Sequence, residues 1–157
     1  MKEDFIVQKA AAEDREKILE MIRKEFPYFS LTEQELWERI RSKNIAVFKA
    51  SSRKKFAGFI EVEFLNGNEA RINGLTIKEE YRGKKAATKL LEKAIGFLKR
   101  KNIERVRLLV KQSNETAKKL YRQYGFQFTG LYNKKLDNEV VEEMELPLIE
   151  ETPKYAA

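Results

Sequence analysis

The chain has 157 residues, a length that suits one domain with a core of its own. Its 32 basic and 25 acidic residues give a net charge of +7, which favours anionic partners such as nucleotide cofactors, nucleic acid or acidic protein surfaces. Cysteine and histidine are absent, so disulfides, thiolate nucleophiles, imidazole bases and metal sites built on these side chains are excluded. Chemistry is left to tyrosine, carboxylates, lysine, serine, threonine, water and the backbone.

The sequence carries no recognisable secretory signal, and no apolar run of about 18 residues could span a membrane. These absences predict a soluble cytoplasmic protein that makes no membrane contact. We expect one domain over residues 1–146 and a loose C-terminal tail over residues 147–157.

The first half of the chain is expected to hold a strand, two helices and three further strands. The strands are predicted at residues 5–9, 45–50, 56–64 and 69–77, and the helices at about 13–26 and from residue 32 onward. Pro27 ends the first helix, and Thr32 with Glu35 has the spacing of a capping box. Asn66-Gly67-Asn68 predicts a hairpin turn between the last two strands. Gly74 interrupts the alternation of its strand, which indicates a bulge or a close backbone approach.

The second half begins with a basic loop and a helix over about residues 84–101. A strand at 105–110, a helix at 115–124 and strands at 126–129 and 140–146 follow. The order βααβββαβαββ contains a strand–helix–strand crossover, which implies a locally parallel pair. We therefore predict a single α+β domain with a mixed, mostly antiparallel sheet flanked by helices.

The loop before the third predicted helix is rich in cations. It contains Arg82, Gly83, Lys84 and Lys85 at a point where free backbone N–H groups meet the positive end of a helix dipole. Such a site suits a phosphate or diphosphate. The alternative is an ordinary solvated turn with basic residues.

Two motifs coincide with this order of elements. Arg82-Gly83-Lys84-Lys85-Ala86-Ala87 resembles the cofactor signature R/Q-x-x-G-x-G/A of the GNAT (GCN5-related N-acetyltransferase) superfamily. Asn114-x-x-Ala117-x-x-Leu120-Tyr121-x-x-x-Gly125-Phe126 is similar to the second motif of that superfamily. The resemblance covers residues 45–146 and implies a GNAT-type fold with acetyl-CoA as co-substrate and no metal.

The resemblance also implies roles for individual residues. Backbone groups of Leu75, Thr76 and Ile77 would pair with the pantetheine arm as an added strand does. Backbone N–H groups from Arg82 to Ala87 would hold the diphosphate, and Asn114 would contact the cofactor from the start of its helix. The strands at 69–77 and 105–110 would splay apart to admit the pantetheine.

Lys85 stands where the superfamily signature has its central glycine. A lysine with a negative φ would keep the N–H contacts, and its ammonium group could add a charge contact. The same side chain could instead crowd the site.

The implied chemistry is attack of an amine on a thioester, which needs a proton acceptor and a proton donor. Tyr121 matches the superfamily's tyrosine and is expected to be the acid; a plain core aromatic is the alternative. Glu61 and Glu69 are the candidate bases. Glu63 is expected to form a cross-strand ion pair with Arg71.

Three functions are compatible with this sequence. The first is an N-acetyltransferase that moves an acetyl group from acetyl-CoA to a primary amine by direct attack in a ternary complex. The second is a non-catalytic acyl-CoA sensor of the same fold, and the third, less favoured, is an RNA-associated protein. The acceptor amine, on a small molecule or a protein, is expected to meet the first two helices and the 130–140 hairpin. Phe26, Tyr28, Phe29 and Trp37 could supply the surface of a homodimer.

Overall fold

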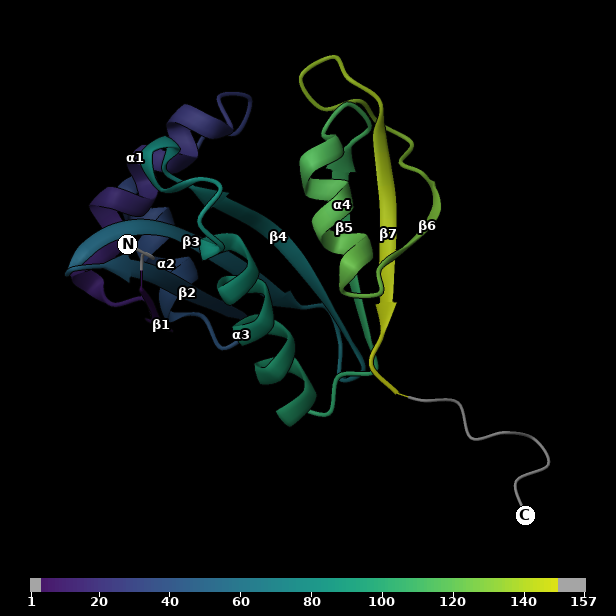
Figure 1. The fold of residues 1–157 in the computed structure, drawn as a ribbon, viewed down its shortest axis with the longest axis horizontal. Coiled ribbons are helices and arrows are strands. Elements are labelled where there is room, and N and C mark those ends of the chain that lie inside the picture. The colour runs from purple at the N-terminus through teal and green to yellow at the C-terminus, as the bar shows by residue number, and fades with distance from the viewer. Residues whose placement is uncertain (1–3, 150–157) are drawn as a thin grey trace.

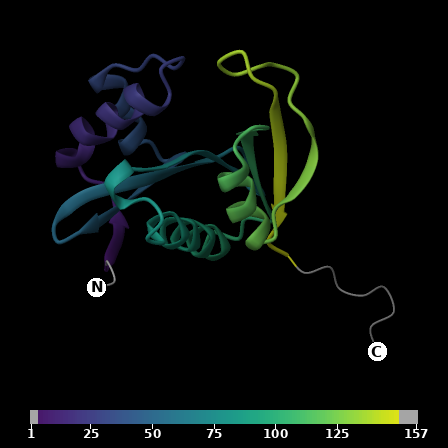
Figure 2. The ribbon, with the colours of Figure 1, turned by 45° about the horizontal axis from the view of Figure 1, so that its top comes forward.

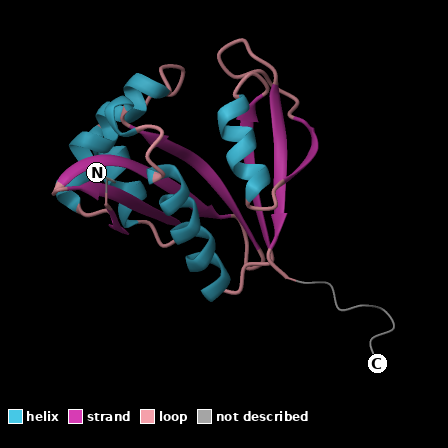
Figure 3. Ribbon diagram, in the orientation of Figure 1, coloured by secondary structure: helices cyan, strands magenta, loops and turns pink. Residues whose placement is uncertain are grey.

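The computed structural model describes residues 4–149 (Figures 1 and 3). Its helices are α1 (Arg15–Glu25), α2 (Glu33–Arg41), α3 (Ala86–Arg100) and α4 (Glu115–Gln123), with short 3-10 turns η1 (Ala12–Asp14) and η2 (Glu79–Tyr81). Its strands are β1 (Phe5–Lys9), β2 (Ile45–Ser52), β3 (Lys55–Phe64), β4 (Glu69–Ile77), β5 (Arg105–Lys111), β6 (Gln127–Leu131) and β7 (Val141–Pro147). The expected tail beyond residue 149 lies outside the described residues.

The strands form one seven-stranded sheet in the order β1-β2-β3-β4-β5-β7-β6. Every neighbouring pair is antiparallel except β4 and β5, which are parallel because α3 crosses over between them. The predicted α+β domain with a mixed, mostly antiparallel sheet is thereby confirmed.

Local signals of the sequence have the predicted structural effects. Thr32 caps α2 by accepting a hydrogen bond from the Glu35 N–H at 3.1 Å, and the Glu35 carboxylate accepts one from the Thr32 N–H at 3.3 Å. Gly125 ends α4 with a φ of +95°, the left-handed conformation expected of a C-terminal cap. The bulge predicted at Gly74 is present, and Asn73 is its extra residue, because Val62 pairs with Ile72 while Glu61 pairs with Gly74.

Helices cover the N-terminal strands on both faces, so the core has two layers (Figure 2). The larger layer lies between the sheet and α3, whose Leu90, Leu91, Ala94 and Leu98 are fully buried. The smaller layer lies under α1 and α2 on the other face, around Ile18, Leu36 and Phe59. None of the helices in the described part is long and apolar enough to span a membrane.

Candidate active site

Strands β4 and β5 lie side by side at their start and then separate (Figure 1). Their pairing runs from Glu69 opposite Arg105 to Ile72 opposite Leu108 and goes no further. From Asn73 onward, β4 is hydrogen-bonded to β3 but not to β5. The unpaired edge of residues 73–77 can therefore accept another extended segment in the manner of an added strand.

Asn73, the extra residue of the bulge, lies where β4 and β5 separate. Its side chain is on the face of the sheet that α1 and α2 cover. Its Nδ2 donates to Glu61 Oε2 at 2.7 Å and to Glu63 Oε1 at 2.8 Å. Its Oδ1 accepts a hydrogen bond from Arg71 Nε at 2.8 Å. Arg71 also pairs with Glu63 at 3.2 Å, the ion pair expected from the register. The side chain of Asn73 thus ties β4 to β3 where the β4–β5 ladder ends.

The basic loop offers free N–H groups at the start of α3. Within the described part of the chain, Gly83, Lys85, Ala86 and Ala87 have no partner for their backbone N–H groups. A Cβ built on Gly83 would meet nothing within 4 Å, so the loop is open to solvent there. These donors, at the positive end of a 15-residue helix, fit a diphosphate.

Arg82 is bound differently from the rest of the loop. Its backbone N–H donates to the Glu79 carbonyl at 3.2 Å and is therefore not among the free donors. Its Nε donates to the carbonyl of Ile77 at 2.9 Å, and its Nη2 donates to Glu25 at 2.9 Å. Arg82 thereby links the end of β4 to the end of α1.

Lys85 has a φ of +72°, so the condition of a negative φ is not met. The residue instead takes the left-handed conformation that glycine adopts readily. The backbone path that the glycine of the signature would provide is therefore preserved, at a conformational cost of about 1–2 kcal/mol for a residue with a Cβ.

Two tyrosines of α4 are held in different surroundings. Tyr121 is buried against Phe126, and this burial raises the pKa of its hydroxyl to about 12. Tyr124 is more open, and burial together with its hydrogen bond to Glu92 Oε1 at 2.5 Å raises its pKa to about 12 as well. Both hydroxyls are consequently protonated at neutral pH. A protonated phenol can donate a proton or a hydrogen bond.

Asn114 caps α4, because its Oδ1 accepts a hydrogen bond from the Ala117 N–H at 3.1 Å. Its amide NH₂ donates to none of the residues that the structure describes. Leu75, Thr76 and Ile77 pair with β3 on one side and lie on the unpaired edge on the other. Asn114 thus lies at the start of α4, and residues 75–77 lie on the open edge of β4.

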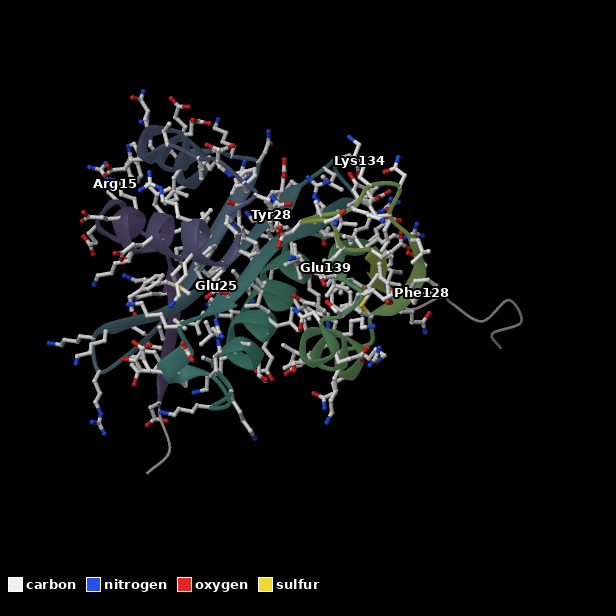
Figure 4. The ribbon with its side chains drawn as sticks, turned by 90° about the horizontal axis from the view of Figure 1, so that it is seen from above. Arg15, Glu25, Tyr28, Phe128, Lys134 and Glu139 are labelled. Atoms are coloured by element: carbon white, nitrogen blue, oxygen red, sulfur yellow. The ribbon has the colours of Figure 1, made fainter. Side chains whose placement is uncertain are left out.

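The loop after α1 and the loop between β6 and β7 meet over the same end of the sheet. The Phe26 ring lies 3.7 Å from a Cβ built on Gly74 and so covers the bulge. Lys111, at the end of β5, has its Nζ 5.2 Å from the centre of the Tyr28 ring and 3.1 Å from Glu139. Figure 4 shows Tyr28 and Glu139 near the middle of the molecule in the view from above. The two loops expected to receive the acceptor thus come together beside the opening.

The two candidate bases lie at different levels of the sheet. Glu61 is opposite Gly74, at the level of the opening, but Arg39 binds both of its oxygens, with Nη2–Oε2 at 2.6 Å and Nε–Oε1 at 3.2 Å. Glu69 lies at the closed end of the β4–β5 pair and contacts Arg107 Nε at 2.7 Å. The structure brings Glu61 to the opening and leaves Glu69 away from it.

Sequence reasoning passed over one carboxylate of this region. Glu143 of β7 lies directly opposite Leu109, the first residue of β5 beyond the paired segment. It is partly buried and borders a cavity of about 120 Å³ together with Leu109 and Tyr132. The sequence Glu142-Glu143 carries no motif, so the pairing of β5 with β7 was the information needed to find it.

Solved structures share this architecture. The ribosomal-protein-S18-alanine N-acetyltransferase of Escherichia coli superposes with a TM-score of 0.79 over 98% of this chain and 100% of that chain, at 20% identity. The PaiA N-acetyltransferase of Thermoplasma acidophilum, solved with coenzyme A, gives 0.66 over 89% and 98%, at 24% identity. The fold is accordingly that of the GNAT acetyltransferases.

A family model described as "Acetyltransferase (GNAT) domain" matches residues 8–144. The chain therefore belongs to the GNAT acetyltransferase family. A protein of Bacillus subtilis (strain 168), provisionally named a ribosomal protein bS18-alanine N-acetyltransferase, is 36% identical over 64 residues. That match covers 41% of this chain and 42% of the relative, less than half of either.

Proposed function

We propose that this chain transfers an acetyl group from acetyl-CoA to a primary amine by direct attack within a ternary complex. The observation that carries the proposal is the end of β4–β5 pairing after Ile72, together with the backbone N–H groups of Gly83, Lys85, Ala86 and Ala87, which have no partner among the described residues. An extended pantetheine arm fits the unpaired strand edge, and a diphosphate fits the N–H groups at the start of α3.

The thioester of acetyl-CoA would supply the carbonyl group that the amine attacks. In this arrangement the thioester carbonyl lies where β4 and β5 separate, within reach of backbone N–H groups of β4 that can stabilise an oxyanion. Tyr121, which is protonated at neutral pH, would donate to the leaving sulfur. Asn114, with its free amide NH₂, would contact the cofactor from the start of α4.

The acceptor would enter from the side of α1 and α2, past Tyr28 and the β6–β7 loop. The B. subtilis relative is named for acetylation of an alanine of a ribosomal protein. The only amine of an alanine residue is the α-amine of a chain that begins with it, so a polypeptide N-terminus is the acceptor class to test first. An α-amine, with a pKa of about 7.7–8.0, is partly neutral at pH 7.5, whereas an alkylamine has a pKa of about 10.4.

Calorimetric titration of the full chain with acetyl-CoA, and with its 3′-dephospho form as the comparison, tests the donor site. A micromolar Kd for acetyl-CoA supports the proposal and justifies turnover assays with an alanine-starting peptide, a lysine peptide blocked at its N-terminus, and spermidine. Absence of binding at millimolar acetyl-CoA would refute it. Binding without turnover of any amine would favour an acyl-CoA-binding module of the same fold.

A further inference from the structure

We infer that Glu143 is the proton acceptor for the incoming amine; this inference rests on the proposed acetyl transfer. Glu143 lies on β7, whereas the candidate bases Glu61 and Glu69 lie on β3 and β4. Three observations carry the assignment: the engagement of the other carboxylates on this face, the register of Glu143 on β5, and the cavity beside it.

Strands β3, β4 and β7 place five glutamates on the face of the sheet from which the acceptor would enter. Four of them are bridged to arginines: Glu61 to Arg39, Glu63 to Arg71, Glu69 to Arg107, and Glu145 to Arg105 and Arg107. Among the described residues, Glu143 alone in this set has no side-chain hydrogen bond or ion pair. A proton can therefore be accepted there without breaking an existing bridge.

Acidic side chains in and beside the flanking loops also form ion pairs with basic residues. Glu25 binds Arg82, and Asp137 and Glu139 bind Lys111. The hydrogen bond from Ser113 and the bridge to Lys111 also lower the pKa of Glu139. These groups hold the loops together at the entrance and are poorly suited to receive a proton.

The register places Glu143 at the level of the opening. It is opposite Leu109, and directly opposed side chains on antiparallel strands have their Cβ atoms about 5 Å apart. Leu109 itself lies on the edge of β5 that is no longer paired with β4. The cavity beside Glu143 is also lined by Leu109 and Tyr132 and by the charged side chains of Arg71, Arg107 and Glu145. It is large enough for water molecules, so the carboxylate can act directly or through one water.

The Glu143 carboxylate takes one proton from the acceptor ammonium and later releases it to solvent. The neutral nitrogen attacks the thioester carbon, the C–N bond forms, and the C–S bond breaks when the tetrahedral intermediate collapses. The second proton of the nitrogen ends on the coenzyme A sulfur, by way of the Tyr121 hydroxyl.

The test is Glu143→Gln in the full chain, assayed with an alanine-starting peptide and, separately, with hydroxylamine, which is already neutral at pH 7.5. At pH 6 only about 1–2% of an α-amine with a pKa of about 7.7–8.0 is neutral, so we expect kcat with the peptide to fall about 50-fold or more at that pH. The loss should shrink to a few-fold as the pH rises to 8. The hydroxylamine rate and the calorimetric Kd of acetyl-CoA should stay within about twofold of the wild type, since neither needs the base.

Glu145→Gln is the matched control, because Glu145 lies two residues further along the same face and is bridged to arginine. It should leave the pH profile with the peptide unchanged. The inference is overturned if Glu143→Gln retains peptide activity within threefold at pH 6. It is also overturned if the variant loses peptide and hydroxylamine activity equally, which would indicate a structural role. A wild-type chain that binds acetyl-CoA but acetylates neither nucleophile would refute the proposed function instead.

Discussion

Arg39 of α2 binds Glu61 of β3 through both carboxylate oxygens, with the shorter contact at 2.6 Å. Glu61 is 6% exposed, so this bridge lies largely out of water and fastens α2 to the sheet beside the β4 bulge. Glu61 lies at the level of the opening, where a base was expected. It instead anchors α2, the helix that borders the proposed acceptor entrance.

Replacing Glu61 by alanine should lower the free energy of unfolding by about 2 kcal/mol. The change leaves the Arg39 guanidinium without its carboxylate acceptor and the Asn73 amide with Glu63 alone, and an unsatisfied, partly buried donor costs about 1–3 kcal/mol. Urea unfolding followed by circular dichroism measures the effect. Glu16→Ala on α1 is the control, since the Glu16 side chain forms no ion pair or hydrogen bond with the residues that the structure describes. A loss no greater than that of the control would mean that the bridge contributes nothing in solution.

Lys85→Gly should raise the free energy of unfolding by about 0.5–1 kcal/mol. The relief of the left-handed conformation at φ +72° outweighs the extra entropy that glycine gives the unfolded chain. The matched variant is Lys84→Gly, at a neighbour whose φ is not positive, and it should be neutral or destabilising. Chemical denaturation of both variants distinguishes them; equal effects would contradict the assignment of strain to Lys85.

Tyr121→Phe should reduce kcat by about 100-fold and leave the Kd of acetyl-CoA unchanged, because the lost hydroxyl serves the leaving sulfur and not the bound donor. Burial raises the pKa of Tyr121 to about 12, so the acid stays protonated as the pH rises. The wild-type kcat should therefore show no decline attributable to this group up to pH 10.

Tyr124→Phe provides the comparison for that prediction. Its hydroxyl donates to Glu92 of α3, so its removal should cost stability and leave kcat within about threefold. A larger kcat effect for Tyr124→Phe than for Tyr121→Phe would reverse the roles of the two residues.

Glu63→Gln tests the electrostatics of the Asn73 network. The hydrogen bond from Asn73 and the charge of Arg71 hold the pKa of Glu63 below its usual value. A carboxylate whose pKa is lowered on folding stabilises the protein above its unfolded pKa of about 4.3, and this contribution is lost as the pH falls through the folded value.

The variant should therefore be less stable than the wild type at pH 7, by a few tenths to about 1 kcal/mol given the exposure of the pair. The difference should shrink as the pH falls below the unfolded pKa of about 4.3 and through the lower folded value. Urea unfolding at pH 7 and at pH 3 measures it, and a difference of the same size at pH 3 would show that the effect is not electrostatic.

Much of the fold and of the donor site could be predicted from short stretches of sequence. The apolar stripe of α3, the capping box of Thr32 and the turn at Asn66-Gly67-Asn68 act through neighbours a few residues away, so their effects are local. The motif from Asn114 to Phe126 likewise lies on one helix and its cap. These features gave the element order, the family and the loop at the start of α3.

The tertiary structure decided what depends on residues far apart in the chain. Arg53 and Lys54 form a two-residue turn with positive φ, although neither is a residue type that favours it, because the pairing of β2 with β3 imposes the conformation. The sign of φ at Lys85 is set in the same way by the elements that the loop joins.

The register of the strands is the clearest example of a feature that only the tertiary structure decided. The sequence by itself determined that carboxylates occur on several strands, and it placed Glu61 near the opening. The structure then showed that Arg39 binds Glu61 from a helix 22 residues away, and that Glu143 faces Leu109 across a strand pair. A side chain's cross-strand neighbour depends on which strands pair and in what register, and no local pattern encodes either.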